Sequence, residues 1–296
     1  MGTENQTPSE RYWLCPLYSF NCDCESVNLA EGVQIIRIPS KFVEYLDKHF
    51  SDLLKTIPSE AEWVASLPYN ENTSANDLLV DLITALRLHQ QGRVVAGLLT
   101  FATFHNSEWV IRGTTSWTPV SSIDFFLEDP IYKFRHTDVL KINNLLLNIR
   151  KWREAGILNN INIALERFHS AYHGPIEDRI IDQMIAFESL YLGNEQELTY
   201  KLALRTAFLL RKRKDHRSRI FANMKEAYKY RSRIVHGDNP PSRDELRVIV
   251  PNTGDYLRQS IQKFLLLLST GMSLNEIRNQ LDENILTNGR TLPPIE

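Results

Sequence analysis

Two side chains near the end of a predicted helix have the chemistry needed to bind and break a phosphodiester: Arg231 and His236. Arginine binds phosphate through a planar guanidinium that is always charged, and histidine exchanges protons near neutral pH. RNA carries its own nucleophile, the 2′-OH, so a cleaving site needs a proton carrier and a cation that stabilises the charge on phosphorus. The bland alternative is a solvated helix end with a capping histidine, and spacing alone does not separate the two interpretations.

The spacing of Arg231 and His236 limits how they can act together. Residues five positions apart on an α-helix point about 140° away from each other. One helix therefore cannot direct both side chains at one phosphate unless its end unwinds, which Gly237 permits. The other route is a twofold dimer, which pairs Arg231 with His236 of the partner subunit or collects two of each in one cleft.

Further residues are candidates for positioning these groups or holding the substrate. Glu188 is predicted to orient Arg231 or Arg205, or to form a buried ion pair, and the two roles are compatible. Tyr228 is predicted to stack a base or to belong to the core. The supporting and RNA-binding candidates that remain lie beside the motif or in a predicted interhelical loop, which has a purely solvated alternative: Ser232, Arg233, Arg211, Lys212, Arg213 and Lys214.

The charge distribution agrees with a polyanion partner. Between residues 201 and 233 there are twelve Lys or Arg against two acidic residues, although the whole chain carries a formal charge of −2. A local excess of +10 is the electrostatic footprint expected of a nucleic-acid binder. The alternative is an ordinary basic helix face that acidic neighbours balance in the fold.

Composition sets the class of protein. The 296 residues suffice for one large or two ordinary domains, and 43% hydrophobic with 24% charged residues is typical of a soluble globular protein. The polar segment 1–10 does not resemble a secretory signal, and the apolar run 264–268 is too short to cross a bilayer. We therefore expect a cytoplasmic protein without a membrane partner.

The cysteines and two spaced histidines raise the question of a metal. Cys15, Cys22 and Cys24 are an odd, clustered set that predicts no disulfide framework, and they fall short of the four ligands that zinc prefers. Free thiols in a reducing compartment are the favoured interpretation. His169 and His173 lie one helical turn apart, but no third ligand is evident in the sequence, so packing roles are favoured. We expect no metal and no cofactor.

Hydrophobic periodicity divides the chain in two. Residues 1–136 are predicted to form an α+β domain, with a helix that Ser40 caps and a segment, 78–88, that suits either strand or helix. Residues 137–286 are predicted to form an all-α bundle, and 287–296 a disordered tail. The expected strands are 33–38, 94–104 and 108–117, and the expected helices are 40–54, 138–155, 159–172, 176–192, 197–210, 218–235, 242–270 and 273–284.

Three blocks in the second half resemble the HEPN superfamily, in particular its Apea-like branch. They are RIIDQMIAFESL at 179–190, ELTYKLALR at 197–205 and YKYRSRIVHG at 228–237, and the resemblance covers about 138–270. It implies a helical bundle that dimerises and brings two R-x4-6-H motifs into one cleft. Active members are metal-independent endoribonucleases of toxin–antitoxin and phage-defence systems. By position, Arg231 and His236 are the motif residues.

Two positions depart from patterns within that superfamily. Ser232 stands where Asn, Asp or His often follows the arginine, and Asp238 stands where some toxins carry a tyrosine that a partner enzyme modifies. The second departure argues against such a paired antitoxin and leaves the cleavage chemistry untouched.

These observations together predict a two-domain endoribonuclease of bacterial defence or toxin systems. It would cut RNA, with tRNA as one candidate, by 2′-OH attack, leaving a 2′,3′-cyclic phosphate and a 5′-OH. The expected partners are a second copy and a regulatory protein or phage trigger, sensed or positioned by the N-terminal domain. The first alternative is a non-catalytic module that binds RNA, a nucleotide or a protein. A weaker one is a metal-dependent enzyme using His169, His173 and a carboxylate.

Overall fold

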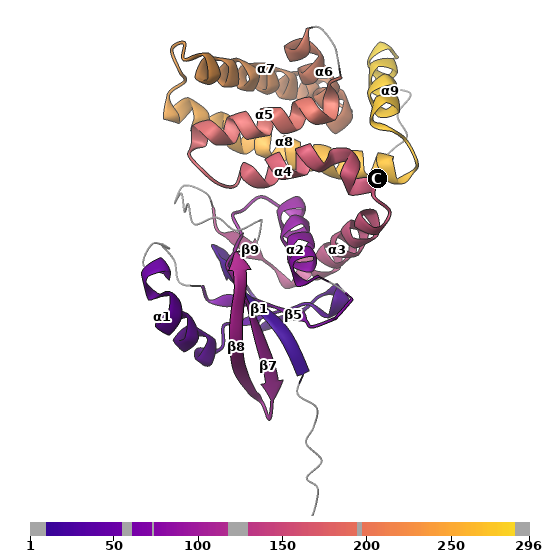
Figure 1. Ribbon diagram of the computed structural model, residues 1–296. Helices are drawn as coiled ribbons and strands as arrows, with labels where there is room; N and C mark the ends of the chain where they lie inside the picture. Colours follow the sequence, from indigo (N-terminus) through magenta and orange to yellow (C-terminus); the bar gives the residue numbers. More distant parts are fainter. Residues whose placement is uncertain (1–9, 55–60, 73, 118–129, 194–196, 288–296) are drawn as a thin grey trace, which may run out of the picture. The chain divides into compact units, whose positions relative to one another are not determined.

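The computed structural model describes residues 10–54, 61–72, 74–117, 130–193 and 197–287. The chain divides into two compact units, Met1–Arg150 and Lys151–Glu296 (Figure 1). The first contains the β-strands and the second is helical, so an α+β region followed by a helical region is confirmed. The expected disordered tail, 287–296, lies outside the described residues except for Thr287.

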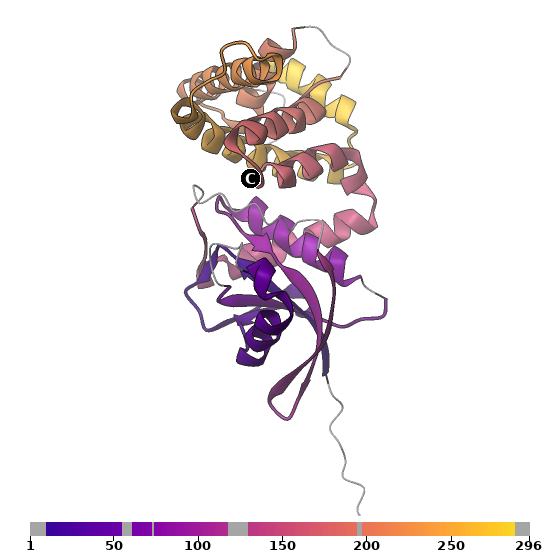
Figure 2. The same cartoon turned by 60° about the vertical axis from the view of Figure 1, so that its left-hand side comes forward.

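The first unit is built on an antiparallel sheet in the order β3-β4-β5-β1-β7-β8, with β6 also paired to β1. Strand β1 is central, because Trp13 pairs with Leu67 on one side and Phe101 on the other. The bounds are β1 (Glu10–Tyr18), β3 (Ser26–Asn28), β4 (Gln34–Arg37), β5 (Trp63–Pro68), β6 (Val95–Ala96), β7 (Leu98–His105) and β8 (Glu108–Trp117). Strands β7 and β8 form a twisted hairpin (Figure 2), which turns at Asn106 and Ser107, both with positive φ.

Two helices flank this sheet. Helix α1 (Ser40–Leu54) packs Phe42 and Leu46 against Leu14 of β1, as its amphipathic pattern predicts. Helix α2 (Ala75–His89) begins where Ser74 accepts a hydrogen bond from the Asp77 amide at 3.3 Å. Every residue of α2 from Leu78 to Leu88 is buried except Val80, which is half-buried. This part of the helix therefore has no exposed polar face. Because such a face produces the hydrophobic periodicity of a helix, the sequence pattern did not distinguish strand from helix here.

A parallel strand pair brings two distant segments of the first unit together. Strand β2 (Phe20–Cys22) pairs with β9 (Tyr132–Phe134), and the rings of Phe20 and Tyr132 stack with centroids 5.6 Å apart. The Asp23 amide extends the pairing by donating to the Phe134 carbonyl at 3.2 Å. The turn after β2 therefore lies beside the short 3₁₀ helix His136–Asp138 that follows β9.

The boundary between the units falls after Arg150, which corrects the expected boundary after residue 136. Helix α3 (Val139–Glu154) is tied to the first unit along most of its length. Asn143 accepts a hydrogen bond from the Ala30 amide at 2.7 Å, and Arg150 lies 3.6 Å from the buried carboxylate of Asp81. The change from strand to helix in the sequence therefore precedes the change of unit.

The second unit is a helical bundle. Its helices are α4 (Asn162–Ser170), α5 (Ile176–Tyr191), α6 (Leu198–Leu210), α7 (Lys214–His236), α8 (Arg243–Ser269) and α9 (Leu274–Leu286). Tyr191 joins α5 to α8, because its hydroxyl lies 2.7 Å from Ser260 Oγ and its ring meets Phe264 edge-on. Helix α8 continues through Pro251, one of the two possibilities that the sequence left open. Helix α7 begins at Lys214 instead of the expected residue 218.

We predict that Ser242→Ala destabilises the second unit by about 1 kcal/mol. Ser242 caps α8: its hydroxyl accepts from the Glu245 amide at 3.2 Å, and Glu245 accepts from the Ser242 amide at 2.7 Å. Urea unfolding followed by helical circular dichroism measures the change. The matched control is Ser218→Ala, which removes an exposed hydroxyl within α7. Equal midpoints for the two variants would contradict a stabilising cap.

Candidate functional site

Arg231 lies on the side of α7 that packs against α5. Its Nη2 atom is 3.8 Å from Glu188 Oε2, and each of the two side chains is 25% exposed. At 3.8 Å this is an ion pair without a good hydrogen bond. The Arg231 Nε atom is buried and has no hydrogen-bond acceptor among the described residues. The guanidinium is therefore held electrostatically; its unpaired Nε is shielded from solvent, so a phosphate would contact the exposed quarter of the side chain.

Tyr228 completes this group one turn earlier on α7. The Arg231 guanidinium carbon lies 5.9 Å from the Tyr228 ring centroid, and the charges of both Glu188 and Arg231 act on the phenol. Burial, and then the Glu188 carboxylate, raise the pKa of Tyr228, while Arg231 opposes them. The phenol therefore stays protonated beside Glu188. Of the two arginines proposed as partners of Glu188, Arg231 is the one with which it forms an ion pair.

His236 is the last residue of α7 and is exposed. The helix keeps its regular geometry up to this residue and closes at Gly237, where φ is 72° and the amide bonds to the Ile234 carbonyl at 3.3 Å. The helix end does not unwind before His236. Arg231 therefore faces α5 while His236 points in a direction about 140° away, and one copy does not present both to one phosphate.

Ser232 and Arg233 line an open groove of about 740 Å³ on the outer side of α7. Arg233 also fixes the chain after the helix, because its Nε donates to the Asn239 carbonyl at 2.6 Å. The groove carries more positive than negative charge and has aromatic walls. Its lining residues are Thr199, Phe221, Ala222, Lys225, Glu226, Tyr228, Lys229, Ser232 and Arg233.

The sequence reasoning missed Lys225 and Lys229 as groove residues. They lie one turn apart on α7, and Lys229 is three residues before Ser232, so all three share one side of the helix. Helical spacing from the motif could have identified them. Tyr200, which is 52% exposed and meets Phe221 edge-on at 5.5 Å, adds an exposed aromatic ring beside the groove.

The basic run 211–214 is more ordered than the expected loop. Arg211 closes α6 and donates to Gln259 Oε1 of α8 at 2.7 Å, and Arg213 pairs with Asp215 at 3.1 Å. Lys214 is the first residue of α7, so its assignment to a loop was wrong. Lys212 is exposed.

A lysine that the sequence reasoning did not select joins this run. Burial, and then the nearby charges of Arg211 and Lys212, lower the pKa of Lys263 on α8. A local concentration of positive charge of this kind favours an anion. Arg231 lies 17 residues further along α7 than Lys214, which corresponds to about 26 Å. The structure therefore does not bring the basic run and the motif into one small site, although an RNA strand is long enough to reach both.

Arg205 serves the packing of the bundle. It is 2% exposed, and its Nε and Nη2 atoms donate to the two carboxylate oxygens of Asp282 in α9 at 2.8 and 2.7 Å. Its Nη1 atom donates to the Tyr191 carbonyl. The bidentate contact joins α6 to α9, and the bond to Tyr191 joins α6 to the end of α5. Arg205 therefore has a structural role in the bundle.

Possible metal ligands do not gather around His169 and His173. Across the described parts of the chain, the one group of three His, Cys, Asp or Glu side chains with ligand atoms close enough to hold an ion is Cys22, Asp23 and Cys24 in the first unit. The helical unit thus offers no support for the metal-dependent alternative at the two histidines within the residues described.

We predict that the two arginine–carboxylate pairs differ in their contribution to stability. Asp282→Asn should cost about 2 kcal/mol, because it leaves the buried Arg205 charge without its counterion, although the exposed side of Asp282 reduces the effect. Glu188→Gln should cost less than about 1 kcal/mol, since its pair is longer and the arginine that it leaves unpaired is more exposed than Arg205. Chemical unfolding measures both.

The matched control for this comparison is Asp215→Asn, which removes an exposed pair with Arg213 and should leave the unfolding midpoint unchanged. If Glu188→Gln proves as costly as Asp282→Asn, Glu188 is a structural counterion and its assignment to a functional site is wrong.

Comparisons of sequence and structure find no match for the chain among known proteins: no family model, curated protein or solved structure matches it. None of the helices in the described residues combines the length and the apolar composition that crossing a membrane requires.

Proposed function

We propose that the helical unit is a metal-independent endoribonuclease of the HEPN type that acts as a homodimer. The observation that supports this most is the state of the two motif residues. Arg231 is partly exposed and is held beside Glu188 by an ion pair without a good hydrogen bond, and His236 is exposed at a rigid helix end. One is suited to clamp a phosphate and the other to exchange protons with a substrate.

In this mechanism, Arg231 binds a non-bridging phosphate oxygen and stabilises the charge that develops on phosphorus. His236 acts as general acid–base, taking the proton from the 2′-OH or giving one to the departing 5′ oxygen. Glu188 positions the guanidinium through their ion pair, and the protonated Tyr228 phenol lies beside both groups. The products are a 2′,3′-cyclic phosphate and a 5′-OH.

A second copy is part of the proposal because the two side chains diverge on α7. In a twofold dimer, Arg231 of one copy meets His236 of the partner subunit. The groove with Lys225, Lys229 and Arg233 would hold the RNA backbone, and Tyr228 and Tyr200 offer rings for bases. The cations at 211–214, with Lys263, would contact a more distant part of the same strand. Bacterial defence or toxin activity in the cytoplasm, with a regulatory protein or phage trigger, is the setting that the HEPN resemblance implies.

The alternative function is a non-catalytic module that binds RNA, a nucleotide or a protein. One observation favours it: Arg231 already has a carboxylate partner, and one copy does not aim both motif residues at a common point. In that case the motif would stabilise the bundle and the groove would bind without cleaving.

We predict that full-length protein cleaves tRNA or total RNA in excess EDTA, and that His236→Ala and Arg231→Ala each reduce the rate by about 100-fold or more. Gel electrophoresis of the products measures the rate, and end-group analysis identifies the cyclic phosphate. The matched controls, His216→Ala and Arg219→Ala, change residues nearer the start of α7 and should retain activity. The catalytic assignment fails if the wild type leaves RNA intact or if His236→Ala cleaves equally well.

We further predict that mixing Arg231→Ala with His236→Ala restores activity. Each mixed dimer would contain one composite site with both intact residues, so random exchange of subunits should recover about a quarter of the wild-type rate. If the site formed within one chain, no mixed dimer would have an intact site and the mixture would stay inactive. Copurification of both variants through an affinity tag carried by one of them checks that the variants exchange subunits.

A further inference from the structure

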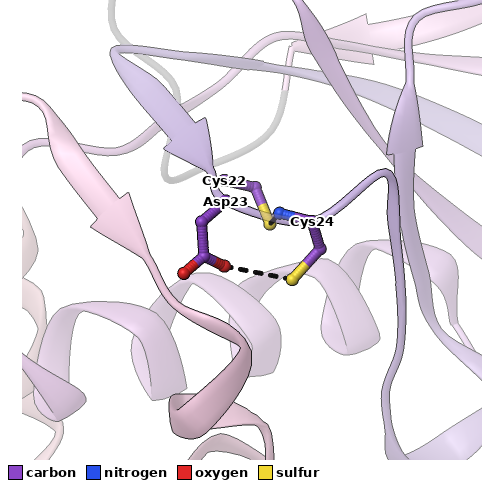
Figure 3. A group of neighbouring side chains, drawn as sticks. All are labelled: Cys22, Asp23 and Cys24. Carbon is purple, nitrogen blue, oxygen red and sulfur yellow. Dashed lines mark hydrogen bonds between the residues drawn. The ribbon is translucent and has the colours of Figure 1, made fainter.

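Three consecutive side chains in the first unit converge on one small space at the end of β2 (Figure 3). The ligand atoms of Cys22, Asp23 and Cys24 all lie within 4.8 Å of one another. Cys24 Sγ is 3.1 Å from Asp23 Oδ1, and the Cys24 amide donates to Cys22 Sγ at 3.3 Å. The turn thus brings two sulfur atoms and a carboxylate close to one another, although adjacent residues of an extended strand would point to opposite sides.

A fourth donor comes from a segment 112 residues away in the chain. Cys24 Sγ is 3.8 Å from His136 Nδ1. The parallel pairing of β2 with β9 places His136 there, because Cys22 is in register with Phe134 and the two strands end side by side. The His136 amide also donates to Asp23 Oδ1 at 2.8 Å, which ties the two segments together at this point.

Two thiols, an imidazole and a carboxylate are a donor set that zinc binds in proteins. With Zn–S of about 2.3 Å and Zn–N of about 2.0 Å, tetrahedral ligand atoms lie about 3.5 Å apart. The contact of 3.8 Å between Cys24 Sγ and His136 Nδ1 is close to this spacing. His136 lies outside the group whose atoms are mutually within 4.8 Å, so its exposed ring must turn slightly to complete the site.

We propose that Cys22, Asp23, Cys24 and His136 form a binding site for a zinc-like divalent ion. Four protein ligands leave no open position, which is typical of a structural site. The ion would join the ends of β2 and β9 and fix the turn that leads into α3. Cys22 is buried, Cys24 is partly exposed, and Asp23 and His136 are exposed, so an ion can enter from solvent. This site is independent of the RNA chemistry proposed for the second unit.

Metal titration of the full-length chain tests the site. Reduced, chelator-treated protein is titrated with Co²⁺, whose visible absorption reports tetrahedral thiolate coordination, and Zn²⁺ is then added in competition. We expect one ion per chain, displacement of Co²⁺ by Zn²⁺, and a higher melting temperature when Zn²⁺ is present. Alkylation followed by mass spectrometry should show that Zn²⁺ protects Cys22 and Cys24.

Substitution of each proposed ligand, compared with control substitutions elsewhere, tests which side chains bind the ion. Cys22→Ser and Cys24→Ser should abolish Co²⁺ absorption, and His136→Gln should weaken binding roughly tenfold or more. The matched controls are Cys15→Ala, which alters a buried thiol of β1, and His105→Gln, which alters a histidine of the β7–β8 hairpin; both should bind as the wild type does. Circular dichroism shows whether each variant is folded, and His136→Gln tests the site even if Cys22→Ser does not fold.

Three outcomes would overturn the proposal. The first is a folded, reduced wild type that takes up no Co²⁺ or Zn²⁺. The second is binding that is unchanged in the Cys24→Ser and His136→Gln variants. The third is a Cys22–Cys24 disulfide that forms in the presence of Zn²⁺, which would identify the pair as redox-active instead of metal-binding.

Discussion

Helix α7 stays regular through His236 and closes on a left-handed Gly237, and the functional proposal depends on this rigidity. A regular helix sends Arg231 toward α5 and His236 into solvent. The helix end does not relax to bring the two together, since the amides of Gly237 and Asp238 both bond back to the last turn. The Arg233 side chain, bonded to the Asn239 carbonyl, holds the following segment as well. If the two motif residues act on one phosphate, the second of them must come from another copy.

Two arginine–carboxylate pairs of the second unit differ in role. The Arg205–Asp282 pair holds helices together, and the Arg231–Glu188 pair leaves its arginine partly exposed. Arg205 is buried, and its three donor nitrogens meet Asp282 and the Tyr191 carbonyl at hydrogen-bonding distance. Arg231 is more exposed, and its ion pair with Glu188 is too long for a good hydrogen bond. A buried guanidinium whose donors are all hydrogen-bonded cannot bind a substrate, whereas a partly exposed one in a long ion pair can exchange its partner for a phosphate. The geometry therefore separates two arginines that the sequence offered as alternative partners of Glu188.

Local patterns predicted most of the helical unit, because each of its helices carries its own signals. Helices α5 and α8 have apolar stripes, and Gly193 and the Ser242 cap mark a stop and a start. The start of α7 was missed because its first residues are polar and basic. In the first unit, strands β1 and β5 were missed: both are buried over most of their length, so they lack the alternation that marks a half-exposed strand. Arg231 and His236 were selected as candidates by type and spacing, and that selection stays a prediction; the pairing of Arg231 with Glu188 depends on the packing of α5 on α7.

The proposed metal site includes a ligand that local sequence patterns could not identify. Counting ligands near Cys22 and Cys24 found three cysteines and argued against zinc, because the fourth donor lies beyond any sequence window. Strand pairing supplies it: β2 and β9 run parallel, so the residues after each strand arrive at the same edge, and His136 lies beside Cys24 there. Parallel strands need a long connection between them. Hydrophobic periodicity within each strand does not show which strands pair with each other. A ligand set assembled in this way holds together two segments that the chain itself keeps far apart, which is the situation in which a bound ion constrains a fold most.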